Sequence, residues 1–378
     1  MILTDQQIMI RDMARDFASH EMAPHVRQWE QDDEPPVWVL KKLGELGLMG
    51  ACISTEYGGA GVDFVSYVLA TEEIARADCG VCNMMNVHNS PICAAVQDYG
   101  SDPQKKSLLP RMASGELIGT FLLTEPQAGS DAAAITTTAR AVDGGYILNG
   151  TKQFITSGKT ADVAMIVAVT DPEGGRKGMS CFITPTDNPG YIVTRVEDKL
   201  GHRTCDTCQI IMEDMFVPDT DLLGPSGEGY KIALAYLMGG RIGVGAQSVG
   251  VAQAALDAAA DYARERETFG NRLVDHQAIA FKLADMATQV ESARQMVLHA
   301  AQLKDAGVPC LKEASMAKLH ASVVAEQVCS EAVQIHGGYG FLSDYIVEKL
   351  YRDARVLQIY EGASEVQKML ISREFSRD

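Results

Sequence analysis

Apolar residues recur every three or four positions through the first third of the chain, a spacing typical of amphipathic helices. The first such run places apolar side chains on successive turns at Ile8, Met13, Phe17 and Met22. Residues 37–48 repeat the same period. Interruptions rich in Pro or Gly, at residues 35–36, 57–61 and 99–103, predict loops between helices. Residues 1–116 are therefore predicted to form a helical domain.

The period changes between residues 117 and 226, where β-branched and alternating segments replace the helical pattern. These segments are residues 136–142, 146–148, 163–169, 180–184 and 209–211. Asp143, Gly144 and Gly145 separate two of them and form a hairpin signal. This middle part is predicted to be an all-β module.

Residues 227–378 return to a helical pattern, with alanine-rich stretches at 252–264 and 277–303 that are long enough to pack into a bundle. The sequence Gly307, Val308, Pro309 separates two of these helices. The order of helices, strands and helices predicts an α+β fold, mostly α, with a β domain between two helical domains.

Net charge and the start of the chain narrow the class of protein. The formal net charge of −17 argues against a nucleic-acid or anionic-membrane partner, which would need a basic surface. No apolar run is long and clean enough for a membrane span. Thr4 and Gln7 have capping-box spacing, and so the N-terminus is predicted to start a helix and not a signal peptide. We expect an intracellular protein.

Nine cysteines without a secretory signal indicate reduced thiols. Cys79 and Cys82 form one CxxC pair, and Cys205 and Cys208 form another. The pairs are far apart in sequence and lack nearby His at zinc-finger spacing, so we predict buried or loop thiols and no metal site.

Glu361 is the leading candidate for chemistry. It stands before a capping-box pair, Ser364 and Gln367, which predicts a helix beginning at Ser364 and a loop carboxylate in front of it. Taken alone, such a glutamate is usually a solvated surface charge.

Four further motifs have the composition of ligand-binding loops. Residues 124–131 combine small residues and hydroxyls around a proline turn, although an ordinary turn would look the same. Phe154 and Thr156 are two residues apart on a predicted strand, so both should face one side, as a core pair also would. Residues 265–270 place Arg266 and Thr268 at a helix end, where a guanidinium can bind a diphosphate or simply be solvated. Residues 334–341 form a glycine cluster.

Together these motifs resemble the acyl-CoA dehydrogenase family over essentially the whole chain. The C-terminal signature is matched by Gln334, Gly337, Gly338, Gly340, Phe341, Asp344, Lys349 and Asp353. The first signature is matched by Thr124, Glu125, Ala128, Gly129, Ser130 and Asp131. It departs at Leu122, where a smaller residue is usual.

The resemblance implies an N-terminal helical domain, a middle β-barrel-like domain and a C-terminal four-helix bundle, assembled as a homotetramer, a dimer of dimers, around FAD. It assigns one set of residues to the flavin: Phe121, Leu123, Thr124, Ser130, Phe154, Ile155, Thr156, Ala363 and Glu365. It assigns a second set to the ADP half, partly across a subunit interface: Arg266, Thr268, Gln277, Gln334, Gly337 and Gly338.

The resemblance also implies the reaction, in which Glu361 removes the α-proton of an acyl-CoA while the β-hydrogen leaves as hydride to the flavin. The implied substrate-binding residues are Ser130, Met238, Arg241, Tyr360 and Gly362. Some members carry the base on the bundle helix, at the position matching Gly240 here, which has no side chain. Glu361 is therefore the candidate that fits.

At three positions this sequence departs from the family pattern, and these departures limit which residue roles the resemblance implies. Met238 stands where many members have an Asp that helps hold pantetheine, and Ala363 replaces a commoner Thr. Cys82 stands where glutaryl-CoA-type members have an Arg, which argues against a dicarboxylyl substrate.

The expected function is oxidation of a short, medium or branched acyl-CoA, with electrons passed to an electron-transfer flavoprotein. An enoyl-CoA reductase, an acyl-CoA oxidase and a non-catalytic acyl-CoA-binding scaffold remain alternatives. The expected compartment is the bacterial cytoplasm, or the mitochondrial matrix if a transit peptide was removed.

Overall fold

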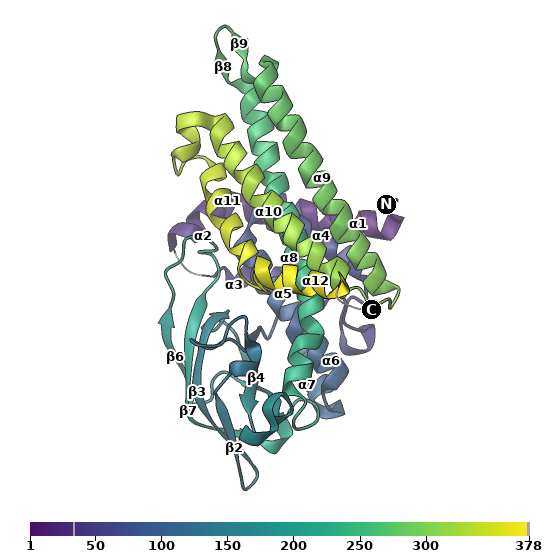
Figure 1. Cartoon of the computed structure of the whole chain (residues 1–378), viewed down its shortest axis with the longest axis vertical. Coiled ribbons are helices and arrows are strands. Elements are labelled where there is room, and N and C mark those ends of the chain that lie inside the picture. Colours follow the sequence, from purple (N-terminus) through teal and green to yellow (C-terminus); the bar gives the residue numbers. More distant parts are fainter. Residues whose placement is uncertain (33–34, 376–378) are drawn as a thin grey trace.

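The computed structural model describes residues 1–32 and 35–375. Helices form both ends of the chain and a β-sheet lies between them in sequence, so the predicted fold class is confirmed. In Figure 1 the sheet occupies one end of the elongated molecule, and the long helix α8 (Gly229–Glu265) runs from beside the sheet towards the other end. Within the described residues, no helix is long and apolar enough to cross a membrane.

The N-terminal helices agree with the predicted period. They are α1 (Asp5–Phe17), α2 (Val26–Asp32), α3 (Val37–Glu45), α4 (Phe64–Ala77), α5 (Cys79–Val87), α6 (Ala94–Tyr99) and α7 (Asp102–Ala113). The capping box of Thr4 and Gln7 is confirmed at the start of α1. The predicted loop at 99–103 is too long, because Ser101 caps α7 and Pro103 lies in its first turn, where a missing N–H costs nothing.

The middle sheet has seven strands in the order β1-β4-β2-β3-β7-β6, with β5 paired to β4. The strands are β1 (Gly119–Leu122), β2 (Thr138–Val142), β3 (Gly145–Thr156), β4 (Val163–Val169), β5 (Met179–Pro185), β6 (Tyr191–Val196) and β7 (Thr207–Pro218). The β2–β3 hairpin is confirmed, with Gly144 at φ 75° in its turn. The prediction missed β1, which is short, and β6, which is largely exposed and so lacks a clear apolar face.

The C-terminal part contains α8 (Gly229–Glu265), α9 (Gln277–Asp305), α10 (Leu311–His336), α11 (Ile346–Ala354) and α12 (Ser364–Ser372). A small hairpin, β8 (Glu267–Thr268) and β9 (Asn271–Arg272), joins α8 to α9. The break at residues 307–309 is confirmed between α9 and α10. Both predicted helices are present, and α8 starts well before residue 252 because its buried N-terminal half packs against all three parts of the fold.

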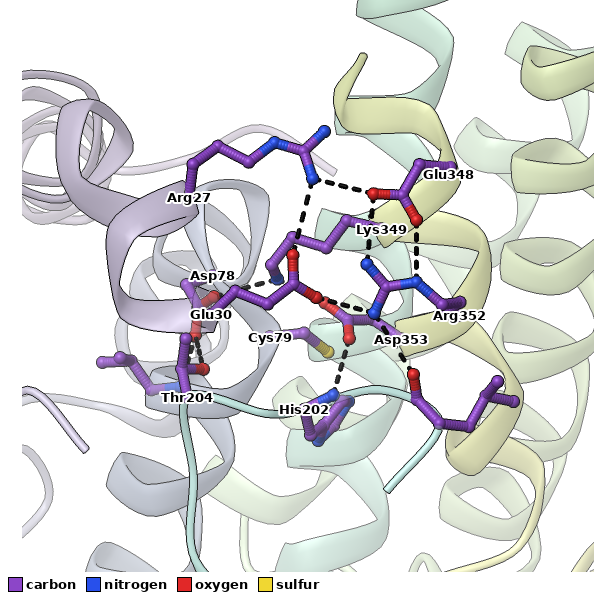
Figure 2. A network of polar contacts seen from close by, with 12 residues as sticks. Arg27, Glu30, Asp78, Cys79, His202, Thr204, Glu348, Lys349, Arg352 and Asp353 are labelled. Atoms are coloured by element: carbon purple, nitrogen blue, oxygen red, sulfur yellow. Dashed lines mark hydrogen bonds and ion pairs between the residues drawn. The ribbon is translucent and has the colours of Figure 1, made fainter. Parts of the chain in front are cut away.

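A buried ion network joins these three parts (Figure 2). At its centre Lys349 of α11 contacts Asp353 Oδ2 at 2.5 Å and Asp78 Oδ2, at the start of α5, at 3.0 Å. The loop before β7 adds the His202 N–H, which donates to Asp353 Oδ1 at 2.6 Å, and the Thr204 hydroxyl, which donates to Asp78 Oδ1 at 2.5 Å. Burial disfavours the charge on Lys349, but the two carboxylates outweigh it and raise the Lys349 pKa.

A second, partly exposed layer covers this centre. Arg27 and Glu30 of α2 bind Glu348 and Arg352 of α11, with contacts of 2.8 Å between Arg27 and Glu348 and 2.6 Å between Arg352 and Glu30. The network fixes α11, and with it the start of the segment that carries Glu361, against the N-terminal helices and the middle domain.

We expect Lys349→Met to lower the free energy of unfolding by about 3–5 kcal/mol, because it leaves two buried carboxylates facing each other without a cation. Urea unfolding followed by circular dichroism measures the change. The control is Lys42→Met, which removes an exposed lysine paired with Glu45 and should leave the midpoint unchanged. Equal midpoints for both variants would contradict a stabilising role for the network.

Candidate active site

Glu361 lies in a tight turn between α11 and α12, formed by residues 360–363 and called here the Glu361 turn. Glu361 has φ 52° and Gly362 has φ 90°, so both are in the left-handed region. A non-glycine residue in this region costs on the order of 1–3 kcal/mol when the position is strained, and it persists where its surroundings hold it.

The contacts of Gln367 correct the predicted capping box. The helix α12 does begin at Ser364, but its N-cap residue is Ala363, and no side chain caps it. Gln367 Nε2 instead donates to Gly362 O at 2.8 Å and to Glu361 O at 3.2 Å. A capping box would need Gln367 Oε1 as an acceptor, but this oxygen has no partner among the described residues, and the amide nitrogen binds the carbonyls of the preceding turn.

The carboxylate of Glu361 points at α8. The residue as a whole is half-buried, but its Oε2 is buried and has no hydrogen-bond partner in the described part of the chain. A Cβ added at Gly240 would lie 2.8 Å from this oxygen, so the glycine leaves the space that the carboxylate occupies. The structure therefore places Gly240 and Glu361 against each other.

Two buried cations flank this carboxylate. Arg241 of α8 is buried, with its Nε unpartnered among the described residues, and Lys318 of α10 is fully buried. Burial raises the pKa of Glu361, and the charges of Arg241 and Lys318 oppose this rise without cancelling it. Burial also lowers the pKa of Arg241 and lowers that of Lys318 to about 8. The carboxylate is thus a stronger base than an exposed glutamate.

Tyr360 anchors the other side of the turn. Its hydroxyl donates to Gln247 Oε1 at 2.7 Å, and its ring meets that of His202 edge-on at 5.9 Å. Gln247 in turn donates to Cys79 O at 2.7 Å. The turn is thereby linked to α8 and to the N-terminal helices.

The predicted flavin residues of the middle domain come from the C-terminal ends of strands β1 and β3 and from the loop after β1, and are called here the sheet-edge group. They are Phe121, Leu123, Thr124, Ser130, Phe154, Ile155 and Thr156. Glu125 fixes the loop that carries Thr124 and Ser130. It pairs with buried Lys152 at 2.9 Å and accepts the N–H of Thr137 at 3.0 Å. Burial alone would raise the pKa of Glu125, but Lys152 and the hydrogen bonds lower it to about 2.

Phe154 and Thr156 occur at an irregular point of β3. The pairing of β3 with β7 shifts register between Lys152 and Ile155, and Phe154 adopts φ 59°. Phe154 is 65% exposed, Ile155 is buried and Thr156 is half-buried. Asn83 of α5 donates to Thr156 Oγ1 at 3.3 Å.

Two members of the sheet-edge group point inward. Leu123 and Ile155 are buried in two separate clusters of the protein's own core, and their carbonyls accept hydrogen bonds from Lys152 Nζ at 3.0 Å and from the Gly158 N–H at 3.3 Å. Phe121 and Thr124 are half-buried and Ser130 is exposed.

The predicted ADP residues gather at the opposite end of the long helices and are called here the helix-end group. They are Arg266, Thr268, Gln277, Gln334, Gly337 and Gly338. The Arg266 guanidinium lies 5.7 Å from the centre of the Tyr339 ring, which brings the hairpin to the glycine cluster. A Cβ at Gly337 or Gly338 would meet nothing within 4 Å, so this backbone is open to close approach. In Figure 1 the hairpin β8–β9 and the sheet lie at opposite ends of the elongated molecule.

Met238, Ala363 and Glu365 are the other residues that were predicted to bind cofactor or substrate. Met238 is half-buried and its sulfur accepts a weak contact from the Cys310 thiol at 3.8 Å, so it presents no polar group for pantetheine. Ala363 and Glu365 begin α12, and Glu365 is exposed.

The cysteines are free, and all are buried except half-buried Cys52. In residues 1–32 and 35–375, no group of three or more His, Cys, Asp or Glu side chains is arranged to hold a metal ion.

Sequence reasoning missed Lys318, Asn83 and Gln247. Lys318 resembles a surface lysine in a helix, but its neighbours one turn away, Ala314 and Ala321, place it on the buried face of α10. That periodicity was the available signal. Asn83 and Gln247 carry no such signal, because their partners are distant in sequence.

Comparisons with known proteins agree with this architecture. Three family models match the chain: acyl-CoA dehydrogenase, N-terminal domain, over residues 4–116, the middle domain over 120–215, and the C-terminal domain over 227–375. An acyl-CoA dehydrogenase of Bacillus subtilis is 48% identical over 99% of this chain and 98% of its own. An acryloyl-CoA reductase (NADH) of Anaerotignum propionicum is 43% identical over 98% of this chain and 95% of its own.

Solved structures give the same result. Butyryl-CoA dehydrogenase of Megasphaera elsdenii has a TM-score of 0.97 and 41% identity, and each chain is covered to 100%. A chain in the structure described as the electron transferring flavoprotein of Acidaminococcus fermentans has a TM-score of 0.98 and 45% identity, covering 100% of this chain and 99% of that one. A glutaryl-CoA dehydrogenase of Mycobacterium smegmatis in complex with FADH2 has a TM-score of 0.94 and 32% identity over 99% and 95%.

Removing the buried charge should stabilise the fold at neutral pH. The pKa of Glu361 is raised in the native state, so the native protein loses stability as pH rises from the ordinary glutamate range through that pKa. We expect Glu361→Gln to raise the melting temperature by roughly 1–2 °C at pH 7.5, with no gain near pH 4. Glu365→Gln, at an exposed position of α12, is the control. A gain that does not depend on pH would contradict the burial of the charge.

Proposed function

The chain belongs to the acyl-CoA dehydrogenase family of flavoprotein oxidoreductases, and we propose that it oxidises short acyl-CoA thioesters to trans-2-enoyl-CoA with Glu361 as the catalytic base. The observation that supports this most directly is the Glu361 carboxylate, which is buried, unpartnered at Oε2 and raised in pKa. A carboxylate in this state suits removal of a proton from carbon, which an exposed carboxylate does poorly.

The amide of Glu361 supplies a second element. Its N–H donates to no backbone or side-chain acceptor in the described part of the chain. We propose that this N–H binds the thioester carbonyl and stabilises the enolate character that develops as the α-proton leaves. Base and donor then belong to one residue, so their spacing is set by the backbone conformation of that residue.

The residues present fit FAD. The sheet-edge group offers the hydroxyls of Thr124, Ser130 and Thr156 beside exposed Phe154, and Gly129 faces open space. The helix-end group offers the Arg266 guanidinium for a diphosphate and the open backbone of the glycine cluster. Bound FAD would supply the acceptor for the β-hydride.

We propose that a second copy of the chain completes each FAD site. In Figure 1 the hairpin β8–β9, beside the helix-end group, lies at the opposite end of the molecule from the sheet that carries most of the sheet-edge group. Phe269 and Phe341, next to the helix-end group, are 97% and 86% exposed, which suits an interface. A homotetramer built as a dimer of dimers satisfies both observations.

The relatives guide the choice of substrate and partner. The similarity to butyryl-CoA dehydrogenase supports a short acyl chain, and the similarity to a chain from the Acidaminococcus fermentans structure supports an electron-transfer flavoprotein as electron acceptor. The bacterial relatives support a bacterial cytoplasmic enzyme. We also retain domain boundaries after residues 116 and 226 as a proposal.

A second candidate is an enoyl-CoA reductase that uses the same residues in the reverse direction, favoured by the similarity to acryloyl-CoA reductase. Faster turnover with an enoyl thioester and a reduced carrier than with an acyl thioester and an oxidised one would select it. Peroxide release in air would instead indicate an oxidase, and a protein that binds no flavin would indicate an acyl-CoA-binding scaffold.

We expect Glu361→Gln to abolish bleaching of the flavin by butyryl-CoA, with a loss of at least about 100-fold in rate, because the amide cannot take the proton. Stopped-flow absorbance measures the rate. The flavin content should equal that of the wild-type protein, since Glu361 is assigned to the substrate and not to the cofactor. Bleaching at the wild-type rate would refute the role of Glu361 as the base.

Short chains should be preferred over long ones. We expect butyryl-CoA to reduce the flavin about tenfold faster, relative to KM, than dodecanoyl-CoA, because the chain is similar to butyryl-CoA dehydrogenase over its whole length. A series of straight and branched acyl-CoAs with an artificial electron acceptor tests this. A maximum beyond eight carbons would contradict the short-chain assignment while leaving the reaction class intact.

A further inference from the structure

The carbonyl oxygen of Gly362 accepts two hydrogen bonds from buried side chains. Lys318 Nζ, from the middle of α10, donates at 2.8 Å, and Gln367 Nε2, from the first turns of α12, also donates at 2.8 Å. Both residues are fully buried, at 0% exposure. We call Lys318 and Gln367 the carbonyl clamp.

Burying Lys318 here is expensive unless it is compensated. A buried ammonium needs an opposite charge or hydrogen-bond acceptors, and within residues 1–32 and 35–375 Lys318 contacts no carboxylate directly. Its acceptor is the Gly362 carbonyl, and the charges that face it are Glu361 and Glu365, which favour its charged form, and Arg241, which opposes it. Among the described residues, the Glu361 turn is therefore the only direct partner of the Lys318 ammonium.

Gln367 is committed to the same turn. Its amide nitrogen reaches both Glu361 O and Gly362 O, while its Oε1 has no partner among the described residues. A Cβ at Gly362 would lie 2.6 Å from Gln367 Nε2, so the glycine is needed for this approach as well as for its φ of 90°. The absent side chain of Gly362 thus makes room for the carbonyl clamp.

The carbonyl clamp determines where Glu361 points. It holds the carbonyls on the C-terminal side of Glu361, while the hydrogen bond from Tyr360 to Gln247 holds the residue on the N-terminal side. With both flanking peptides fixed, Glu361 remains at φ 52°, its carboxylate faces Gly240 and its N–H stays free. Without the clamp, relaxation of this strained residue would move both groups together.

We propose that Lys318 and Gln367 are positioning residues for the reaction, which hold the base and the amide donor of Glu361 in the reactive geometry, and that Lys318 in addition keeps that base ionised. This inference rests on the proposed function of Glu361. The two residues share the positioning role, but only Lys318 carries charge, and so their variants should differ in one measurable respect.

The test compares Lys318→Met with Gln367→Met by stopped-flow flavin reduction with butyryl-CoA across pH. We expect both variants to bind FAD and to reduce it about 10- to 100-fold more slowly, because small displacements of a catalytic group cost this much. Only Lys318→Met should move the acidic limb of the rate profile to higher pH. Its lost charge no longer helps Arg241 lower the pKa of Glu361, and the effect should be largest below pH 8, where Lys318 is protonated.

A second readout isolates proton removal from electron transfer. A 3-thiaacyl-CoA has sulfur in place of the β-carbon, so it loses no β-hydride, but its α-hydrogens still exchange with D2O when a base removes them. We expect exchange, followed by NMR, to slow in both variants and to remain unchanged in Lys42→Met, whose exposed lysine lies on α3.

The outcomes separate this inference from the function beneath it. If wild-type protein neither bleaches with any acyl-CoA nor exchanges the α-hydrogens, the proposed function is wrong. If the wild type does both and Lys318→Met matches it in rate and pH profile, the positioning role is wrong. A slower Lys318→Met protein whose acidic limb stays in place would overturn the role of its charge, and so would an equal shift in Gln367→Met.

Discussion

The site depends on one unpartnered carboxylate oxygen. Oε2 of Glu361 is buried against Gly240 and has no hydrogen bond in the described structure, while two buried cations, Arg241 and Lys318, stand near enough to favour its ionised form. Burial without a partner raises the pKa of the Glu361 carboxyl group, and the two cations limit this rise because they favour the ionised form. The surrounding fold has to supply this balance, because a solvated glutamate would have neither property.

The long helix α8 organises that balance. It contributes Gly240 and Arg241 beside the carboxylate and Gln247 below Tyr360, and it packs against α4, α9, α10 and α11. The buried network around Lys349 fixes α11 to α5 and to the loop before β7, as Figure 2 shows. The strained turn is thus mounted between rigid elements, which is what a functional group held in a costly conformation requires.

The predicted cofactor residues are divided between two separate regions of the fold. Helix α5 links the sheet-edge group to the Glu361 turn, since Asn83 donates to Thr156 and the Cys79 carbonyl accepts from Gln247, the partner of Tyr360, whereas the helix-end group lies at the far ends of the long helices. The proposed catalytic base and the residues proposed to bind the ADP half of FAD therefore lie in different regions of one chain. For this reason the proposed function includes association with a second copy of the chain. The large exposed aromatic residues beside the helix-end group are consistent with that arrangement.

Local pattern determined much of this protein. The helical period, the β-rich middle segments and the 143–145 turn follow from interactions between residues close in sequence, and the structure confirms them. The resemblance to a family identified Glu361 and the empty position at Gly240. Short β1 and exposed β6 were missed because neither displays a regular apolar face.

Tertiary structure decided the rest. The sequence presented Ser364 and Gln367 as a capping box, but Gln367 binds the carbonyls of the preceding turn, together with a lysine 44 residues away from Gly362. No spacing rule contains such a contact, because the partners meet only after α10 and α12 pack. The basicity of Glu361 has the same origin: the sequence supplied a carboxylate, and burial between helices distant in sequence changed its pKa.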